Sequence, residues 1–203
     1  ARPGCSRTAS RGSWASHAFT RQASRGRRAR TTTATTSWPA SPPLARRGGR
    51  GLLAPALAAY GTALLKRRAF AEAEAAAREW VSAASEAVEM GSLVEAHTAL
   101  GEVQRMSGER EGAVASYTKA MAVAEKVASG PLLARAALGR GQAALALGRL
   151  DEAREVLARA AEALRQDDPA GLLPEVLIST GEARLLSGEP EEAWEAAFDL
   201  AGL

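Results

Sequence analysis

The sequence of 203 residues repeats itself every 40 residues. Each of the three clearest copies places two glycines and an alanine at the same spacing, as Gly101, Gly108 and Ala113, then Gly141, Gly148 and Ala153, then Gly181, Gly188 and Ala193. Gly61 begins a weaker copy, in which Arg68 stands where the second glycine is expected. A fixed period of this length is typical of an array of supersecondary units, in which each unit packs only against its neighbours.

Each period has the pattern of two amphipathic helices. Apolar residues at helical spacing fill 93–106, the dipeptide Ser107-Gly108 interrupts them, and a second helical pattern follows over 113–127. Ser129-Gly130-Pro131 is predicted to end that helix and open the next one. By the same logic, Met90-Gly91-Ser92 is predicted to end the second helix of the first unit.

The small residues of the motif indicate where the paired helices cross. Gly101 and Gly141 have no side chain, so two helix axes can approach toward the short end of the usual range of about 8–10 Å. Tyr117 and Leu157 come sixteen residues later and are predicted to fill the space between these small positions.

These motifs resemble the tetratricopeptide repeat, which has Leu-Gly on its first helix, Gly at the turn and Ala-x-x-x-aromatic on its second helix. Leu100-Gly101, Gly108 and the segment from Ala113 to Tyr117 match, and the next copy matches with Leu157 at the aromatic position. The resemblance covers roughly 52–203. It implies an all-α fold, a right-handed α-solenoid of antiparallel helix pairs.

Two features depart from the common family pattern. The period is 40 residues rather than 34, and His97 and Gln104 stand where the family has Trp and Tyr. The longer period looks like that of repeats in large bacterial regulators. We expect a disordered segment over 1–50 and a repeat array over 51–203, with units of about 51–91, 92–130, 131–171 and 172–203. Because the sequence stops soon after Trp194, we also expect the natural array to continue.

The net charge of +3 conceals two unlike parts. Residues 1–50 contain eleven Arg and no acidic residue, whereas residues 51–203 carry a net charge of −8. The high isoelectric point therefore belongs to the first segment and does not indicate that the repeats bind nucleic acid. This segment is rich in Ser and Thr and poor in large aliphatic residues, a composition that cannot offset chain entropy by burial.

Four interpretations of residues 1–50 remain open. The segment is a plain linker, a mistranslated flank of a GC-rich reading frame, an acid-free transit peptide, or a weak RNA-binding tail. In the last case the basic run 46–51 would contact phosphates and Trp14 or Trp38 would stack on bases. We expect any nucleic-acid binding to come from this tail alone.

No catalytic or metal-binding pattern is present in the sequence. The two histidines, His17 and His97, are not accompanied by the Cys, His or carboxylate cluster that a metal site needs. Asp167-Asp168 is interpreted as a loop and helix-start pair rather than an acid and base. The single cysteine, Cys5, cannot form a disulfide within the chain, and no membrane span or signal peptide is recognisable. We therefore expect a cytoplasmic protein that is not an enzyme and requires no cofactor.

The resemblance also implies a binding surface, because first helices line the concave groove in this family. By position, the groove would comprise Thr98, Glu102, Arg105, Arg135, Leu138, Gln142, Leu145, Ile178, Glu182 and Leu185, joined in the first and second units by Thr62, Leu65, Lys66 and Met106. Apolar residues and charges of both signs are mixed, without the dense Lys/Arg cluster that would suit a C-terminal carboxylate. This favours a protein or peptide partner with an apolar stripe.

A second hypothesis places the activity outside these residues. The chain would then be a repeat fragment of a larger bacterial signalling protein, such as a kinase or an ATPase-type transcriptional regulator. A phosphate-binding loop, a kinase glycine-rich loop or a helix-turn-helix encoded beside the repeats would distinguish the two hypotheses.

Overall fold

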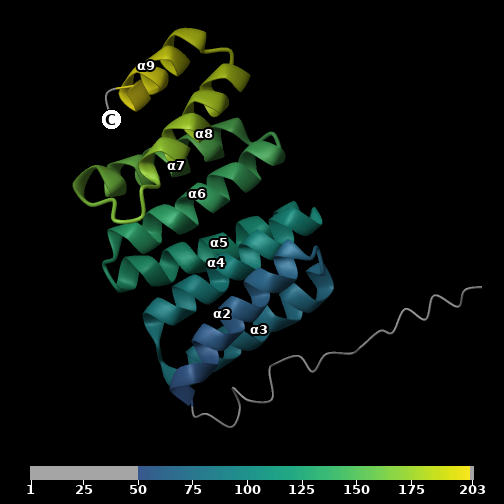
Figure 1. Ribbon diagram of the computed structural model, residues 1–203. Helices are drawn as coiled ribbons and strands as arrows, with labels where there is room; N and C mark the ends of the chain where they lie inside the picture. Colours follow the sequence, from purple (N-terminus) through teal and green to yellow (C-terminus); the bar gives the residue numbers. More distant parts are fainter. Residues whose placement is uncertain (1–49, 202–203) are drawn as a thin grey trace, which may run out of the picture. The chain divides into compact units, whose positions relative to one another are not determined.

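A computed structural model describes residues 50–201, and all regular structure in this range is helical (Figure 1). The helices are α2 (Arg50–Lys66), α3 (Phe70–Ala87), α4 (Met90–Ser107), α5 (Arg110–Lys126), α6 (Gly130–Ala146), α7 (Leu150–Gln166), α8 (Leu173–Leu186) and α9 (Pro190–Ala201). All of them belong to one compact unit. The predicted all-α solenoid is confirmed for these residues, whereas the predictions for 1–49 lie outside the described range.

The helices form antiparallel pairs that stack along the array (Figure 1). Every helix contacts the next one in the sequence, and the first helices of successive pairs, α2, α4, α6 and α8, also contact one another. Within residues 50–201 the second helices make no such contacts with each other. The first helices are therefore the more closely spaced row, and they line the inner side of the array.

The turn inside each pair uses a left-handed backbone conformation at the position of the second repeated glycine. Gly108, Gly148 and Gly188 have φ angles of 92°, 73° and 80°, and Arg68 has a φ of 58° at the equivalent place. Glycine adopts this conformation without steric cost, whereas a side chain does not. The weaker first copy of the repeat therefore keeps the same turn although it has lost the glycine.

The turn between the first two pairs differs from the prediction. Met90-Gly91-Ser92 does not end a helix, because α3 already ends at Ala87 and α4 begins at Met90, so that prediction is wrong. The helix is instead ended by Val88, whose φ of 58° turns the chain so that the amide of Glu89 donates to the carbonyl of Ala84 at 3.1 Å. A β-branched residue is an unusual choice for this conformation, which is why the sequence did not point to it.

The interpretation of Asp168 as a helix-start residue is confirmed. Its carboxylate accepts hydrogen bonds from the amides of Leu172 at 2.8 Å and Leu173 at 2.9 Å, where α8 begins. These bonds, that from Leu173 above all, hold the pKa of Asp168 below its usual range. The carboxylate thus satisfies amides that have no partner inside the helix.

The core relies on contacts between glycines and large side chains, as the motif predicted. A Cβ atom placed on Gly141 would lie 2.7 Å from the side chain of Leu157, and one on Gly101 would lie 2.9 Å from the ring of Tyr117. One contact was not predicted, since a Cβ on Gly139, in α6, would lie only 2.4 Å from the ring of Tyr117. Tyr117 therefore fits between helices of two successive pairs, and it is 1% exposed.

We expect Gly139→Ala to lower the free energy of unfolding by about 1–3 kcal/mol, because the new methyl group would have to displace a ring that is already confined by Gly101. Gly61→Ala is the matched control, since a Cβ on this helical glycine meets nothing within 4 Å. It should raise the free energy of unfolding by about 0.5–1 kcal/mol through helix propensity. Denaturant titrations followed by circular dichroism measure the free energy of unfolding of each variant. If Gly139→Ala and Gly61→Ala change it equally, the packing described is wrong.

A second stability prediction concerns the left-handed Val88. Val88→Gly should raise the free energy of unfolding by about 1 kcal/mol, because the side chain is 70% exposed and its backbone conformation is strained. Val127→Gly is the control, since Val127 also follows a second helix but has a φ of −86°. Val127→Gly should lower the free energy of unfolding by about 0.5–1 kcal/mol. Thermal and urea denaturation measure both changes, which should have opposite signs. If both variants are less stable than the wild type, the backbone angle of Val88 does not have the role described.

Candidate functional site

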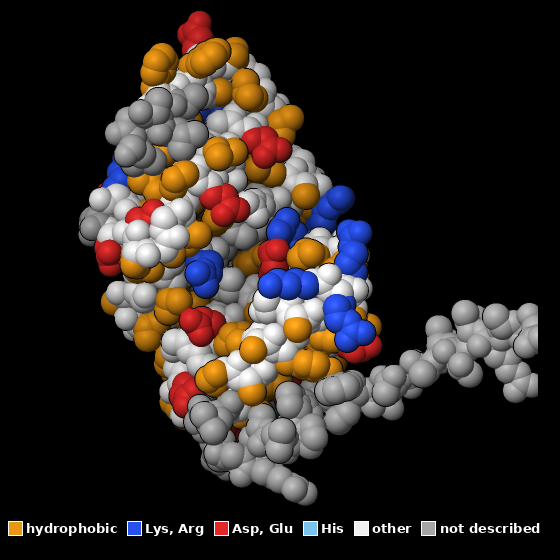
Figure 2. Space-filling view, in the orientation of Figure 1, with side chains coloured by type: hydrophobic (Ala, Val, Ile, Leu, Met, Phe, Trp, Pro, Cys, Tyr) orange, Lys and Arg blue, Asp and Glu red, His pale blue; other side chains and the backbone are white. Residues whose placement is uncertain are grey.

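A cavity of about 530 Å³ lies on the inner side of the array. Its walls come mainly from the first helices α2, α4 and α6, with contributions from α3, from Tyr117 on α5 and from the start of α8. Figure 2 shows acidic, basic and apolar side chains intermixed over the surface of the array. The cavity spans several units and is therefore a product of the stacking rather than of any one helix pair.

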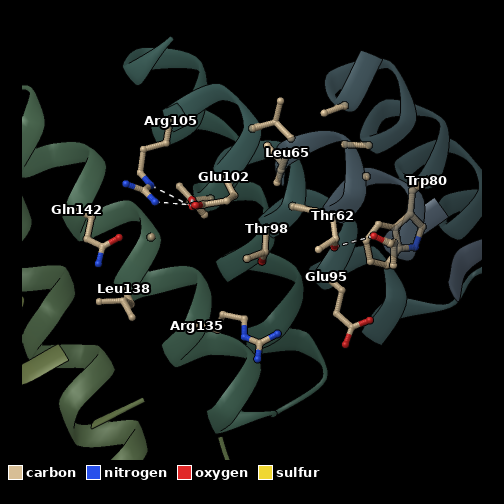
Figure 3. A pocket seen from close by; sticks show the side chains of 18 of the residues that line it. Thr62, Leu65, Trp80, Glu95, Thr98, Glu102, Arg105, Arg135, Leu138 and Gln142 are labelled. Atoms are coloured by element: carbon tan, nitrogen blue, oxygen red, sulfur yellow. Dashed lines mark hydrogen bonds and ion pairs between the residues drawn. The ribbon is translucent and has the colours of Figure 1, made fainter. Parts of the chain in front are cut away.

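Apolar side chains form one part of the lining and hydroxyl groups another. Leu65, Trp80 and Leu138 contribute apolar surface, as seen in the close view of Figure 3. Thr62 and Thr98 donate hydrogen bonds to the carbonyls four residues earlier, at 2.9 Å and 2.8 Å. Because these hydroxyl protons are donated within their own helices, the two threonines have only acceptor capacity left for a bound molecule.

A network of three side chains crosses the middle of the cavity wall. Glu102 accepts hydrogen bonds from Nε and Nη2 of Arg105 at 3.0 Å and 2.6 Å, and from the hydroxyl of Tyr117 at 3.0 Å. The bidentate bond raises the pKa of Arg105, and burial followed by the charge of Glu102 raises the pKa of Tyr117. The network therefore keeps Tyr117 a neutral hydrogen-bond donor over the physiological range.

Two charged residues of the lining have no partner within residues 50–201. Glu95 on α4 and Arg135 on α6 are exposed, line the cavity, and take part in no recorded ion pair or hydrogen bond among these residues. Gln142 and Glu175, in contrast, are joined across α6 and α8 by a bond of 3.0 Å. Glu95 and Arg135 are thus available to a bound molecule, and Glu175, bonded only to a neutral amide among these residues, keeps its charge available as well.

A second hollow of about 460 Å³ adjoins the first and shares residues with it. It lies between α6 and α8, with Arg105 from α4 at its border, and it is lined by Arg105, Gln142, Leu145, Ala146, Glu175, Ser179 and Glu182. Arg105, Gln142 and Glu175 belong to both hollows, so the inner side presents one continuous path along α4, α6 and α8.

The structure brings together most of the residues predicted for the groove. Six line the first cavity, namely Thr98, Glu102, Arg105, Arg135, Leu138 and Gln142, and Thr62 and Leu65 join them. Leu145 and Glu182 line the second hollow. Ile178 and Leu185 line neither one and are 58% and 60% exposed. Their assignment to a groove, like that of the others to partner binding, stays a prediction.

Sequence reasoning missed two carboxylates that the repeat itself could have located. Glu95 and Glu175 stand 40 residues before and after Arg135, and all three residues line the cavity. Applying the period to one predicted position would therefore have found the other two. Trp80 and Tyr117 were missed for a different reason, because they lie on second helices, which were not expected to reach the inner side.

Other kinds of site find no support in the described residues. No group of three or more His, Cys, Asp or Glu side chains within 50–201 is arranged to hold a metal ion. None of the helices in this range is both long and apolar enough to cross a membrane. His97 is half-buried outside the cavity, where burial, followed by the charge of Lys119, lowers its pKa.

Comparisons with known proteins agree with this geometry. Residues 92–166 match the family described as tetratricopeptide repeat. No protein of curated function matches the chain. Among solved structures, BtubC (BKLC) from P. vanneervenii has a TM-score of 0.67 at 13% identity, with 75% of this chain and 63% of that chain covered.

Two further structures are similar. A putative kinesin light chain from Podospora anserina with nearly identical TPR-like repeats has a TM-score of 0.62 at 18% identity, covering 72% of each chain. The apo form of RapI has a TM-score of 0.54 at 14% identity, covering 77% of this chain and 55% of that chain. The chain therefore spans less than two thirds of BtubC and of RapI. At these identities the likeness shows the fold.

The Tyr117 network makes a prediction about high pH. Because burial and Glu102 raise the pKa of Tyr117, the folded chain keeps the phenol proton where the unfolded chain, with a pKa of about 10, has lost it. Stability should therefore fall as the pH rises above about 10, and it should fall less in Tyr117→Phe. In Tyr60→Phe, which leaves Tyr117 as the one tyrosine of the chain, the ultraviolet titration of the phenol should coincide with unfolding. A titration near pH 10 with the fold intact would contradict the network.

Proposed function

We propose that this chain is a protein-interaction scaffold whose inner cavity receives a peptide or helix of a partner protein, and the match of residues 92–166 to the tetratricopeptide repeat supports this proposal. The observation that carries the proposal is the cavity of about 530 Å³, which runs across successive first helices and leaves Glu95 and Arg135 unpaired within residues 50–201. A preformed hollow with apolar walls and a few convergent polar groups is the usual form of a binding site.

The charges of the cavity favour one class of partner over another. Of the lining carboxylates, Glu102 forms an ion pair with Arg105, whereas Glu95 and Glu175 form none within residues 50–201, and Arg135 is the lining cation without a partner in that range. A site for a C-terminal carboxylate or a phosphate would need several convergent cations. The lining suits instead a helical or extended segment that has an apolar stripe and charges of both signs, basic residues facing Glu95 and Glu175 and an acidic residue facing Arg135.

The repeats themselves are not proposed to bind nucleic acid. Residues 51–203 carry a net charge of −8, which would repel a phosphate backbone. Any such activity would have to reside in 1–50, and it would then vanish on removal of that segment and weaken steeply with salt.

A test of the cavity needs ligands selected without reference to a known partner. Peptides that bind the full chain are selected from a random library, and their affinities are then measured for Arg135→Glu and for Glu95→Arg. Both positions are exposed, so neither change should disturb the fold. Reversing a charge that a ligand contacts should weaken binding at least about tenfold for peptides that occupy the cavity.

Arg110→Glu is the matched control, because Arg110 is an exposed arginine at the start of α5 that lines neither hollow. This variant changes the net charge by the same amount as Arg135→Glu and should bind the selected peptides like the wild type. If the peptides bind all variants equally, or if the three variants weaken binding to the same degree, the cavity is not the binding site.

The second hypothesis, that the chain is a repeat fragment of a larger bacterial signalling protein, is compatible with a binding cavity. It differs in the occupant, which would be another domain of the same polypeptide. The sequence of the complete gene tests it directly, since a neighbouring kinase, ATPase or helix-turn-helix region would have to be encoded beside the repeats.

A further inference from the structure

Charges of alternating sign occupy one repeated position of the first helices. Glu95 on α4, Arg135 on α6 and Glu175 on α8 follow one another at intervals of one period, and all three are exposed and line the cavity. On α2 the same position belongs to Pro55, so the row begins at α4. The inner side thus presents a negative, a positive and a negative charge, one on each of three successive first helices. We call these three residues the charge row.

The charge row differs from the charges that connect successive helix pairs. Arg154 on α7, for example, bonds to Glu189 at the start of α9 at 2.8 Å. Within residues 50–201, in contrast, no ion pair involves a member of the row, and Glu175 accepts a hydrogen bond from the neutral amide of Gln142 only. The array is therefore held together by other charges, and a bound molecule can supply the partners of opposite sign that the row lacks.

A second row, mostly apolar, runs beside the charge row. Its members stand three residues later on each first helix and are Ala58, Thr98, Leu138 and Ile178. Residues three apart lie on the same face of a helix, and Figure 3 shows Thr98 beyond Glu95 along α4. The first three members line the cavity, and Ile178 is 58% exposed. A segment that crosses the first helices therefore meets charges on one side and apolar surface on the other.

The spacing of the helices selects the conformation of such a segment. Successive first helices contact one another, and the axes of packed helices lie about 8–10 Å apart. A polyproline II segment rises about 3.1 Å per residue with three residues per turn, so every third side chain faces the same way after about 9 Å. An α-helix returns to the same face after about seven residues and about 10.5 Å. The extended segment thus matches the charge row in both distance and direction.

The size of the cavity also favours an extended occupant. An α-helix with side chains is about 10 Å wide or more, so a helix that crosses three first helices, over about 18 Å, fills roughly 1,400 Å³. The cavity holds about 530 Å³ and the adjoining hollow about 460 Å³. A helix could therefore only rest on the rim, whereas a single extended strand of peptide fits inside.

We propose that the cavity selects an extended peptide segment with a basic, an acidic and a basic residue at every third position and an apolar residue between successive charges. The basic residues face Glu95 and Glu175, the acidic residue faces Arg135, and the apolar residues lie against the second row. This inference rests on the function proposed above and adds the conformation and the charge order of the partner. Residues 1–50 contain no acidic residue, so that part of the chain lacks the pattern.

The first test uses the peptides that are selected from a random library and bind Arg135→Glu more weakly than the wild type. Their charges should follow the order basic, acidic, basic at every third position. In two copies of the tightest peptide, the acidic residue is moved by one place toward either end, which preserves composition and net charge. Fluorescence anisotropy with the full chain should show binding at least about tenfold weaker for both copies, because the acidic residue no longer faces Arg135.

A charge exchange then tests the contact with Arg135. A third copy of the peptide has lysine in place of its acidic residue and should bind the wild type at least about tenfold more weakly. Arg135→Glu turns the row into three negative charges, so this variant should prefer the lysine copy over the parent peptide. Arg110→Glu, which changes the net charge equally and lines neither hollow, should keep the preference of the wild type. Circular dichroism verifies that each variant is folded.

The outcomes separate this inference from the function on which it rests. If peptides weakened by Arg135→Glu have their charges seven residues apart, or tolerate displacement of the acidic residue, the cavity binds peptides but the extended register is wrong. An unchanged preference of Arg135→Glu for the parent peptide would likewise overturn the charge order. If Arg135→Glu weakens none of the selected peptides, both the register and the binding cavity are refuted.

Discussion

The ring of Tyr117 occupies the space between Gly101 on α4 and Gly139 on α6, and the middle of the array depends on this contact. Most other buried residues of the core are alanines, so few side chains are large enough to determine how far apart the helices lie. Leu157 against Gly141 repeats the arrangement one period later. Because interiors are close-packed, the Tyr117 ring and the two glycines set the distance between successive helix pairs. The hollow on the inner side depends on that distance.

The same side chain connects the core to the surface of the cavity. While the Tyr117 ring is buried, its hydroxyl donates to Glu102, which in turn holds Arg105 in a bidentate bond. A carboxylate and a guanidinium that would otherwise be free to bind a ligand are therefore committed to each other. Glu95 and Arg135, which have no partner within residues 50–201, take no part in this network, so the wall contains structural charges and charges available to a partner.

The copies of the repeat tolerate different amounts of divergence at different positions. The turn inside the first pair keeps its left-handed conformation even with Arg68 in place of glycine. Backbone hydrogen bonds from Arg68 to Leu65 and from Ala69 to Leu64 hold the turn at a moderate cost in strain. The glycine at the helix crossing is retained in all four copies, yet it is closely packed only at 101 and 141. At Gly61 and Gly181 the opposing residue is not bulky, so the end pairs are less tightly interlocked than the central ones.

The sequence by itself determined the period, the pairing of helices and the positions of the turns with glycine, because these depend on local backbone conformation and on helical spacing of apolar residues. Most of the residues that it placed in the groove also line the two hollows, since the period transfers a position from one unit to the next. Only the tertiary structure decided that Val88 ends α3, that Gly139 receives Tyr117, and that Trp80 and Tyr117 reach the inner side. These features depend on how successive pairs cross and on which neighbour fills each space, and no local pattern encodes that geometry.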